Sequence, residues 1–469
     1  MVRFLVIILY CILAVVPSGC LHRPSLQREA LEEEGEVYLY LQPFPQEAQR
    51  LRFVLTGISA LRGDGARFPC SLNLGSIKAD EMRRQRYAAS CRLEPGAYAG
   101  FQVSVREAAL RTAEGEASLL VPEQPTALDA PFQIRKKKAQ ALFLSLNYPE
   151  TVKDGFSFRP AFSVLAPPRP VTALGGFLTN TDSDTITVFD RKLGQVVDVV
   201  ATGRRPMGIV LDQQRMRVFV ALAGEDAVEV FDSTSGESLA RIGLQAGDAP
   251  SDIALTPDGR TLLVTDAGMD TLSFIDPQSF LERDRLAVGR GPAGVLIDGA
   301  GMRAYVFNSL ASSITIVDIP NRSVAGLITT EPGPFRGQFD RKGGRLYVIS
   351  EHSPYLSVLD PAGAGAPKRI FVGGEPGALK VDTATDMIYV SKRRGIGVDI
   401  YDPFSFFPAG TIATAGGVDF LAIDGEENNL YLLAPERRAL SAVNVNSRNE
   451  VFRIDTGESP YGVAVTGGR

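Results

Sequence analysis

Residues 206–242 read PMGIVLDQQRMRVFVALAGEDAVEVFDSTSGESLARI. The stretch contains four short apolar segments, at 209–211, 218–221, 228–231 and 239–242, and each is separated from the next by polar or glycine-containing residues. Short apolar segments that alternate with such turns predict β-strands joined by tight connections. The stretch therefore predicts one unit of four consecutive antiparallel strands.

The third strand of this unit ends at Asp232, and the same position recurs along the rest of the chain. It is occupied by Asp190, Asp232, Asp276, Asp318, Asp360, Asp402 and Asn444, at intervals of 42, 44, 42, 42, 42 and 42 residues. A second series on the preceding strand keeps the same interval: Phe177, Phe219, Leu263, Tyr305, Tyr347, Tyr389 and Tyr431. A period of about 40–45 residues with several short strands is typical of a β-propeller blade. We expect each strand-ending residue to cap the turn that follows it with its side-chain oxygen.

The two ends of the repeat region complement each other. The first copy enters at its second strand, near Gly176, whereas a surplus inner strand at 460–465 follows the last copy. Pairing these two pieces would complete a seventh blade and remove the exposed sheet edges. We therefore expect a seven-bladed β-propeller closed by the C-terminal strand. A proline opens the inner strand at Pro206, Pro250, Pro292, Pro334, Pro376 and Pro460, and only the copy near Gly416 and Gly417 lacks it.

Several phrases within these copies resemble a known repeat. Residues 345–348 read RLYV, residues 387–391 read MIYVS, residues 313–318 read SITIVD and residues 257–260 read PDGR. They resemble the YVTN-type propeller repeat of exported and surface proteins of bacteria and archaea, and the resemblance covers residues 173–469. It implies the propeller fold. Related seven-bladed proteins include adhesins, lactonases and lyases, so the fold alone does not assign a function.

The amino terminus has the features of a targeting segment. Arg3 precedes an apolar run over residues 4–16, which fits a signal-peptide core and is short for a membrane span. The run is followed by PSGC at 17–20. Small residues before a cysteine resemble the lipobox of bacterial lipoproteins, although Pro17 stands where that family has an aliphatic residue. The resemblance implies lipidation of Cys20 and anchoring in the cell envelope, and Leu21 favours the outer membrane. The alternative is an ordinary signal peptide cut nearby.

The region between the anchor and the repeats predicts a second all-β unit. Alternating apolar residues indicate strands at 37–41, 52–58, 101–105 and 142–146, which is typical of an antiparallel β-sandwich. Residues 93–98 and 158–160 resemble a domain of unknown function found at the start of many bacterial lipoproteins, which implies an immunoglobulin- or transthyretin-like sandwich. The expected order is signal peptide 1–19, tether 20–35, sandwich 36–165, proline-rich linker 166–172 and propeller 173–469.

The cysteines agree with export. Cys11 lies in the expected signal peptide and Cys20 would be acylated, which leaves Cys70 and Cys91. An exported β-rich domain allows these two thiols to form a disulfide, and closing the loop would stabilise it by about 3 kcal/mol. The alternative is a pair of free buried thiols.

The composition of the chain excludes several kinds of binding site. The 469-residue chain has a net charge of −5 and no long basic run, so nothing indicates a nucleic-acid partner. Its only histidines are His22 and His352, and it has no Trp. A metal site built from several histidines is therefore excluded, and no haem attachment sequence occurs. We expect no cofactor. The alternative that stays open is a propeller hydrolase, lactonase or lyase with a carboxylate-bound metal at Asp182, Asp226 or Asp266.

Propeller ligands usually bind on the face formed by the loops that enter the inner strands and join the second strand to the third. Residues predicted on this face are acidic in the first three copies and basic in the last two, which suggests a two-signed surface for a protein or glycan partner. These candidate binding residues are Asp182, Asp184, Glu225, Asp226, Asp266, Asp270, Arg336, His352, Tyr355, Lys392, Arg393, Arg394, Arg437 and Arg438. The alternative is that charged turns only confer solubility. The sequence thus favours a non-enzymatic, membrane-tethered binding or scaffolding lipoprotein, on either side of the outer membrane.

Overall fold

The computed structural model describes residues 31–165 and 175–468. Within these ranges the protein is all-β, with many four-stranded antiparallel sheets and an architecture compatible with a β-propeller. The predicted signal peptide, Cys20, most of the tether and the linker at 166–172 lie outside the described residues. No helix among the described residues is long and apolar enough to cross a membrane.

Residues 175–468 fold into seven four-stranded sheets, named sheets 1 to 7 here. Sheet 1 combines β14 (Gly175–Asn180), β15 (Thr185–Asp190) and β16 (Gln195–Ala201) with the last strand, β41 (Pro460–Val465). Sheet 2 contains β17 (Pro206–Asp212), β18 (Arg217–Leu222), β19 (Ala227–Asp232) and β20 (Ser238–Gly243). Sheet 3 contains β21 (Pro250–Leu255), β22 (Leu262–Asp266), β23 (Thr271–Asp276) and β24 (Leu281–Ala287).

The remaining sheets follow the same order along the chain. Sheet 4 contains β25 (Pro292–Ile297), β26 (Arg303–Asn308), β27 (Ser313–Asp318) and β28 (Ser323–Thr329). Sheet 5 contains β29 (Pro334–Phe339), β30 (Leu346–Ser350), β31 (Tyr355–Leu359) and β32 (Lys368–Phe371). Sheet 6 contains β33 (Pro376–Val381), β34 (Ile388–Lys392), β35 (Val398–Tyr401) and β36 (Pro408–Ile412). Sheet 7 contains β37 (Phe420–Ile423), β38 (Asn429–Ala434), β39 (Ala439–Asn444) and β40 (Glu450–Asp455).

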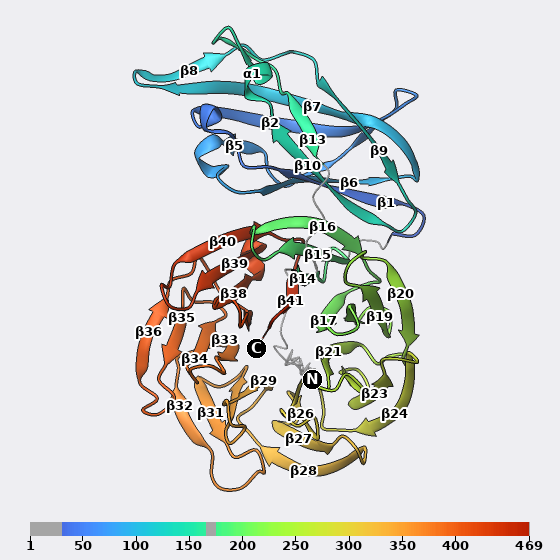
Figure 1. Ribbon diagram of the computed structural model, residues 1–469, viewed down its shortest axis with the longest axis vertical. Helices are drawn as coiled ribbons and strands as arrows, with labels where there is room; N and C mark the ends of the chain where they lie inside the picture. The colour runs from blue at the N-terminus through green and yellow to red at the C-terminus, as the bar shows by residue number, and fades with distance from the viewer. Residues whose placement is uncertain (1–30, 166–174, 469) are drawn as a thin grey trace, which may run out of the picture.

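The sheets follow one another around a ring, with β41 nearest the centre in sheet 1 and the first strand nearest the centre in each of the other sheets (Figure 1). The C-terminal strand pairs with the first strand of the ring: β41 runs antiparallel to β14, with Gly176 opposite Val465 and Leu178 opposite Val463. Sheet 1 therefore contains both ends of the repeat region. This pairing gives β14 a hydrogen-bonded neighbour on each side, since its other edge pairs with β15.

The repeated strand-ending residues cap turns, as the sequence predicts. The Oδ1 atom of Asp232 accepts hydrogen bonds from the backbone N–H groups of Thr234 and Ser235, at 2.9 and 2.8 Å. Asn444 makes the same kind of contacts at the end of β39. An acceptor at this position satisfies backbone donors that the tight turn would otherwise leave exposed. The periodic acids are therefore structural.

Residues 31–165 form two main sheets and short connecting elements. Sheet A has the order β13 (Phe162–Leu165), β10 (Ala139–Leu146), β1 (Gly35–Leu41), β6 (Arg86–Leu93) and β4 (Ser71–Leu72). Sheet B contains β3 (Arg67–Pro69), β2 (Leu51–Arg62), β7 (Gly96–Thr112) and β8 (Gly115–Leu119), with β5 (Ser76–Lys78) paired to β2 and β9 (Thr126–Ile134) paired to β7. The others are β11 (Val152–Lys153), β12 (Ser157–Phe158), α1 (Tyr148–Thr151) and the 3₁₀ turns η1 (Gln46–Ala48) and η2 (Ala79–Glu81).

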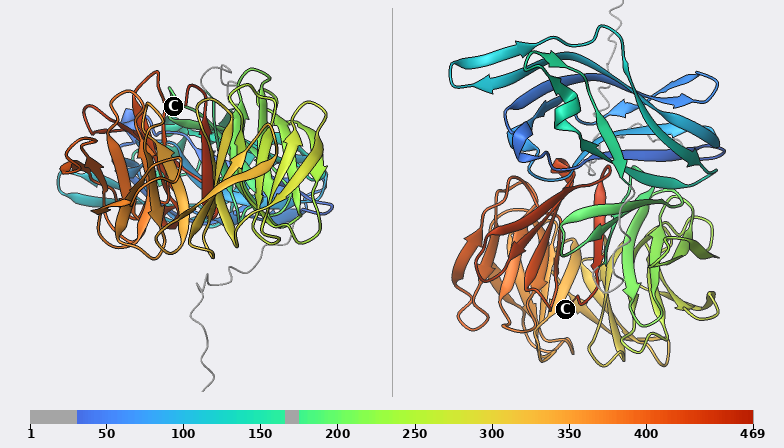
Figure 2. Two further views of the ribbon diagram at one scale, coloured as in Figure 1. Left: turned by 90° about the horizontal axis from the view of Figure 1, so that it is seen from below. Right: turned by 45° about the horizontal axis from the view of Figure 1, so that its top comes forward.

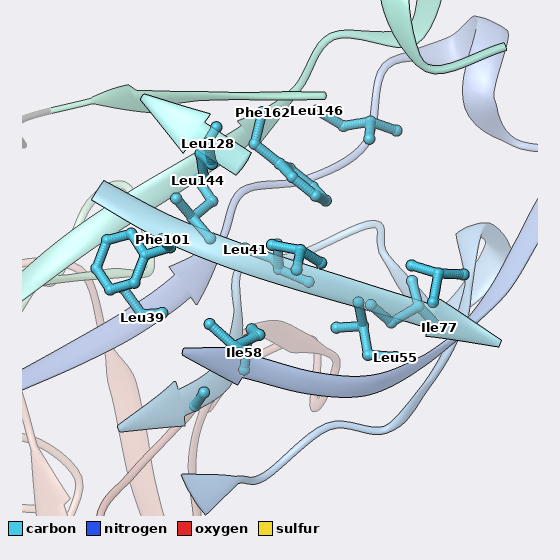
Figure 3. Close-up of a cluster of buried hydrophobic side chains, with 14 of the residues drawn as sticks. Leu39, Leu41, Leu55, Ile58, Ile77, Phe101, Leu128, Leu144, Leu146 and Phe162 are labelled. Atoms are coloured by element: carbon cyan, nitrogen blue, oxygen red, sulfur yellow. The ribbon is translucent and has the colours of Figure 1, made fainter. Parts of the chain in front are cut away.

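The prediction of a purely antiparallel unit is wrong for sheet A. Strands β1 and β10 pair in parallel, with Leu39 opposite Leu142, so the sheet is mixed. A parallel pair needs a crossover rather than a hairpin, and the long chain segment between β1 and β10, which contains sheet B, supplies it. The side chains that sheets A and B direct toward one another form a common apolar core (Figure 3), which includes Leu39, Leu41, Ile58 and Phe101.

Cys70 and Cys91 form a disulfide, as predicted. Cys91 is buried in β6 of sheet A, and Cys70 lies between β3 of sheet B and β4 of sheet A. The bond therefore fixes the segment that passes from one sheet to the other.

The outer face of sheet A packs against sheets 1 and 7 at the side of the ring (Figures 1 and 2). Strand β1 is buried on both faces: Leu39 points into the core between sheets A and B, whereas Tyr38 and Tyr40 join a cluster with residues of the ring. The Gln85 side chain accepts from the Val196 N–H at 2.8 Å and donates to the Val196 carbonyl at 3.1 Å, which pairs the free edge of β16. Both faces of the ring around its axis stay clear of this contact.

Candidate functional site

The inner strands leave a channel of about 400 Å³ along the axis of the ring, lined by residues from all seven sheets. One position of the repeat determines the width of its mouth, namely the third residue of the inner strand or its equivalent. That position is occupied by Gly208, Asp252, Gly294, Arg336, Ala378, Phe420 and Gly462. Four of these residues are Gly or Ala, and only Asp252 and Arg336 carry charge. The two charged residues come from sheets 3 and 5 and flank Gly294 of sheet 4, whereas the other small residues lie in sheets 1, 2 and 6.

Arg336 lies over an aromatic ring and forms no ion pair within 4.0 Å among the described residues. Its guanidinium carbon is 4.5 Å from the centre of the Phe420 ring, which is a cation–π arrangement. Among residues 31–165 and 175–468, no carboxylate oxygen lies within 4.0 Å of this guanidinium. The donors of Arg336 are thus available to an acceptor that enters the channel.

Asp252 stands at the same level, two sheets away. Its Oδ2 atom accepts a hydrogen bond from the Val295 N–H at 3.0 Å. Burial raises the pKa of this carboxyl group, and the nearby positive charge of Arg336 acts in the opposite direction. Gly294 allows the Phe335 backbone and the Asp252 side chain to lie close to β25, because a Cβ at this position would stand 2.6 Å from the Phe335 carbonyl oxygen and 3.4 Å from Asp252 Oδ2.

Aromatic groups and a second arginine complete the mouth. The Arg393 guanidinium carbon is 5.5 Å from the centre of the Phe335 ring, and its Nη1 is 3.4 Å from a Glu351 carboxylate oxygen. Tyr461 lines the same channel, and burial raises the pKa of its hydroxyl. An arginine held on aromatic rings beside a tyrosine can bind a carboxylate or phosphate group and pack against the flat face of a ring.

Three of the predicted acidic residues serve the ring itself. Asp184, Asp226 and Asp270 each adopt a left-handed backbone conformation, with φ of 53, 47 and 57°. Each carboxylate accepts a backbone N–H located 21 residues further along, from Arg205, Gly247 and Gly291 respectively. In each of these three sheets, the aspartate therefore holds the segment that leads into the next sheet through a hydrogen bond to its backbone.

The other three acidic candidates are also engaged. Glu225 forms ion pairs with Arg204 and Arg241. Asp182 accepts a hydrogen bond from the Ser459 hydroxyl. Asp266 is fully buried at the end of β22, where its carboxylate accepts hydrogen bonds from the hydroxyl groups of Thr271 and Ser273.

The basic candidates have acidic neighbours on the same face. Lys392 is 3.0 Å from Asp399, Arg394 is 3.4 Å from Glu375, and Arg438 is 3.3 Å from Glu458. The charges that the sequence places in separate arcs are therefore partly neutralised by local pairs.

Two further candidates, His352 and Tyr355, lie in sheet 5, between β30 and β31 and at the start of β31. Arg437, in sheet 7, contacts a backbone carbonyl. His352 is exposed, whereas the Tyr355 ring packs edge-on against Phe371. Arg437 donates to the Ala415 carbonyl. Of the predicted residues, the channel mouth brings together Arg336 and Arg393. It adds Asp252, Phe335, Phe420 and Tyr461, which could be found by comparing equivalent positions of the inner strands.

A carboxylate metal site is not assembled from the predicted acids. Asp182, Asp226 and Asp266 lie in sheets 1, 2 and 3 and make the separate contacts described above. In the described part of the chain, no group of three or more His, Cys, Asp or Glu side chains is arranged to hold a metal ion.

No protein-family model matches the chain, and no curated protein matches it. Solved structures are similar to its ring. Kuenenia stuttgartiensis hydrazine synthase matches with a TM-score of 0.50 and 18% identity over 62% of this chain and 96% of that chain. A functionally unknown protein from Desulfotomaculum acetoxidans matches with a TM-score of 0.54 and 14% identity, over 62% and 98% of the two chains. The dihydro-heme d1 dehydrogenase NirN, in complex with DHE, matches with a TM-score of 0.51 and 14% identity, over 65% and 78%. The neighbours are propeller-like; at these identities the likeness concerns the fold alone.

Proposed function

We propose that this protein is a non-enzymatic binding protein of the bacterial cell envelope that captures an acidic glycan at the mouth of its channel. In this proposal residues 173–469 are a YVTN-type seven-bladed β-propeller closed by β41. Residues 36–165 are an immunoglobulin- or transthyretin-like sandwich that supports the propeller. A lipid on Cys20 tethers both to the outer membrane, through the segment 20–35, after removal of residues 1–19.

One observation is the main support for placing the binding site at the channel mouth. Arg336 projects into the channel with an aromatic partner and without a carboxylate partner among the described residues. A sugar acid presents a carboxylate for the guanidinium and a ring face for Phe335 or Phe420, whereas Asp252 and Tyr461 can bond to hydroxyl groups. The lipid anchor is supported by the apolar run and the PSGC sequence at the amino terminus, and export is supported by the disulfide between Cys70 and Cys91.

The glycan proposal is tested by calorimetric titration of the chain from residue 21 with oligogalacturonate. We expect binding that Arg336→Gln weakens about tenfold or more, because a charge-assisted bidentate contact is lost. The matched control is Arg394→Gln, which removes the same charge from an exposed arginine of the same face. A neutral maltooligosaccharide should not bind. Absence of oligogalacturonate binding, or equal weakening by both substitutions, would contradict the proposal.

A protein partner is the second candidate, and a different observation favours it. Met269, Leu310 and Ile396 are 50, 70 and 81% exposed on the loops that surround the channel mouth in sheets 3, 4 and 6. Apolar side chains around a concave polar centre are typical of a protein-docking face. Loss of a co-purifying envelope protein in a Leu310→Ser and Ile396→Ser variant, with glycan binding intact, would favour this function.

A further inference from the structure

A second concave site lies away from the channel, where sheet 7 meets sheet 6 and the N-terminal unit. It is a pocket of about 210 Å³. Its lining comes from the segment between β36 and β37, from β38 to β40, and from the residues around the start of β6. The site is therefore completed only when sheet A is docked on the ring.

The pocket is rich in arginine. Five guanidinium groups line it, whereas only two carboxylates do so: the arginines are Arg84, Arg86, Arg437, Arg448 and Arg453, and the acids are Glu450 and Asp455. Five positive and two negative charges leave a local excess of three positive charges (5 − 2 = 3). The whole chain carries a net charge of −5, so this excess opposes the overall balance. A concave surface with concentrated positive charge attracts anions.

Three of the arginines are held in place by the two acids. Arg84 and Arg86 share Asp455, at 2.7 and 2.8 Å. Arg453 pairs with Glu450, which lies three residues earlier in β40. These pairs fix the floor and one wall of the pocket and neutralise only two of the five charges.

The other two arginines have only backbone partners. Arg437 donates to the Ala415 carbonyl at 2.9 Å, and Arg448 donates to the Ala409 carbonyl at 3.3 Å. Within the part of the chain that the structure describes, no carboxylate oxygen lies within 4.0 Å of either guanidinium. A guanidinium has five N–H donors, so each retains donors for a ligand.

Glycines make room for these two side chains. A Cβ at Gly410 would overlap the Arg448 guanidinium, and a Cβ at Gly416 would stand 3.4 Å from Arg437 Nε. Gly416 belongs to the one inner-strand opening that has no proline. Residues 413–416, which lead into this opening, line the pocket beside Arg437.

We propose that this pocket binds a ligand with two or more phosphate groups. Phosphate oxygens match the planar donor fork of arginine, and a ligand with several charges would engage Arg437 and Arg448 while the paired arginines contribute to the field. Two or more phosphate groups occur together on soluble polyphosphates and on phospholipid headgroups that carry two phosphates, such as that of cardiolipin.

The proposal is tested by calorimetric titration of the chain from residue 21 with tripolyphosphate at low salt. We expect 1:1 binding that weakens as salt increases, and about tenfold weaker binding for each of Arg437→Gln and Arg448→Gln. The matched control is Arg260→Gln, on sheet 3, where the arginine is 80% exposed and pairs only loosely with Asp258. Arg448→Lys, which keeps the charge and loses the fork, should bind with intermediate affinity. A second arm uses sedimentation with cardiolipin vesicles, whose headgroups carry two phosphates, and with phosphatidylcholine vesicles as the control. It tells whether such headgroups compete with tripolyphosphate.

Either source of phosphate supports the site if the two arginine substitutions weaken binding and the control does not. The inference is overturned if the unmodified chain does not bind tripolyphosphate or if Arg260→Gln weakens it as much. Arg336→Gln should leave this binding unchanged, because the channel mouth is a separate site. Melting temperatures close to that of the unmodified chain would exclude misfolding of the variants.

Discussion

At the scale of single residues, Asp266 departs from its equivalents in the other sheets. Asn180 and Asn308 hold the same position at the end of the second strand, and each donates from its Nδ2 atom to two hydroxyl groups of the third strand. Asp266 Oδ2 instead accepts from the hydroxyls of Thr271 and Ser273, at 3.0 and 2.8 Å. The side chain is fully buried, so an ionised carboxylate there is poorly solvated.

The pKa of Asp266 is raised to about 7, mainly by burial and also by the neighbouring Asp248, while the two hydroxyl groups and Arg285 act in the opposite direction. An unfolded Asp titrates near pH 4, so the folded chain holds this proton more tightly between about pH 4 and 7. The contribution to stability is therefore fully present below pH 4 and is lost as the pH rises through 7.

The first stability prediction concerns this residue. Asp266→Asn should raise the melting temperature at pH 8 and have little effect at pH 4.5, because the amide avoids the cost of burying a charge. The gain at pH 8 should be on the order of 2–4 kcal/mol in the free energy of unfolding. Thermal unfolding at both pH values measures it. The reverse change, Asn308→Asp, serves as the matched control and should destabilise the chain at pH 8. A gain for Asp266→Asn that is equal at both pH values would contradict the explanation.

The sequence reveals the periodic acids but not their different burial. Asp232 and its equivalents follow a strand and precede a turn, so their capping role can be read from neighbouring residues. The burial of Asp266 depends on packing around the end of β22, and no local pattern indicates it. The pairing of Lys392 with Asp399, or of Arg394 with Glu375, likewise depends on side-chain geometry across a turn. The repeat predicts where the charges are, but not which of them remain available.

At the scale of elements, the disulfide tests how strongly sheets A and B depend on a covalent link. Cys70 and Cys91 are 21 residues apart, and closing a loop of this size stabilises a fold by about 3 kcal/mol in the chain-entropy account. Cys70→Ser combined with Cys91→Ala should therefore lower the free energy of unfolding by roughly that amount. Urea unfolding, followed by circular dichroism, measures the change. A reducing agent should lower the urea midpoint of the unmodified chain and leave that of the variant unchanged; no effect on either would refute the prediction.

Strand positions were largely predictable, whereas some strand pairings were not. Predicted strands at 37–41 and 142–146 lie within β1 and β10, because both are short apolar runs with β-favouring residues. Their parallel pairing joins segments about a hundred residues apart in sequence, and a pattern within each strand carries no information about the direction of its neighbour. The strand pairings within the ring were easier to predict, since most strands there pair with the next strand along the chain through a short turn.

At the scale of the whole molecule, the ring and the N-terminal unit share one apolar cluster. Tyr40 and Phe143 from sheet A and Val199 and Tyr431 from the ring belong to it. Strand β1 is a nearly continuous apolar run, which is typical of a strand covered on both faces, but the sequence does not tell what covers the second face. The cluster and the Gln85 contacts hold the two units in one arrangement, and this arrangement places Arg84 and Arg86 at the pocket of sheet 7.

A buried ion pair also joins the first and last sheets of the ring. Arg191 follows β15 of sheet 1, and its Nη1 is 3.0 Å from Asp424 Oδ2 at the end of the inner strand of sheet 7; both side chains are fully buried. The Tyr431 hydroxyl donates to the same carboxylate oxygen at 3.1 Å, while Asp424 Oδ1 accepts two backbone N–H groups. Removing only one partner of a buried pair leaves an uncompensated charge and usually costs about 3–5 kcal/mol.

Arg191→Met should therefore destabilise the chain by about 3–5 kcal/mol. Arg191→Met combined with Asp424→Asn should recover most of the loss, because the amide oxygen retains the backbone contacts and no buried charge remains. The matched control is Arg215→Met, which breaks a partly exposed pair with Asp212 in sheet 2 and should cost only about 1 kcal/mol. Urea unfolding of the unmodified chain and of the three variants measures these differences. If Arg191→Met cost no more than Arg215→Met, the pair between sheets 1 and 7 would not contribute to closure, and the pairing of β41 with β14 would have to hold the ring together without it.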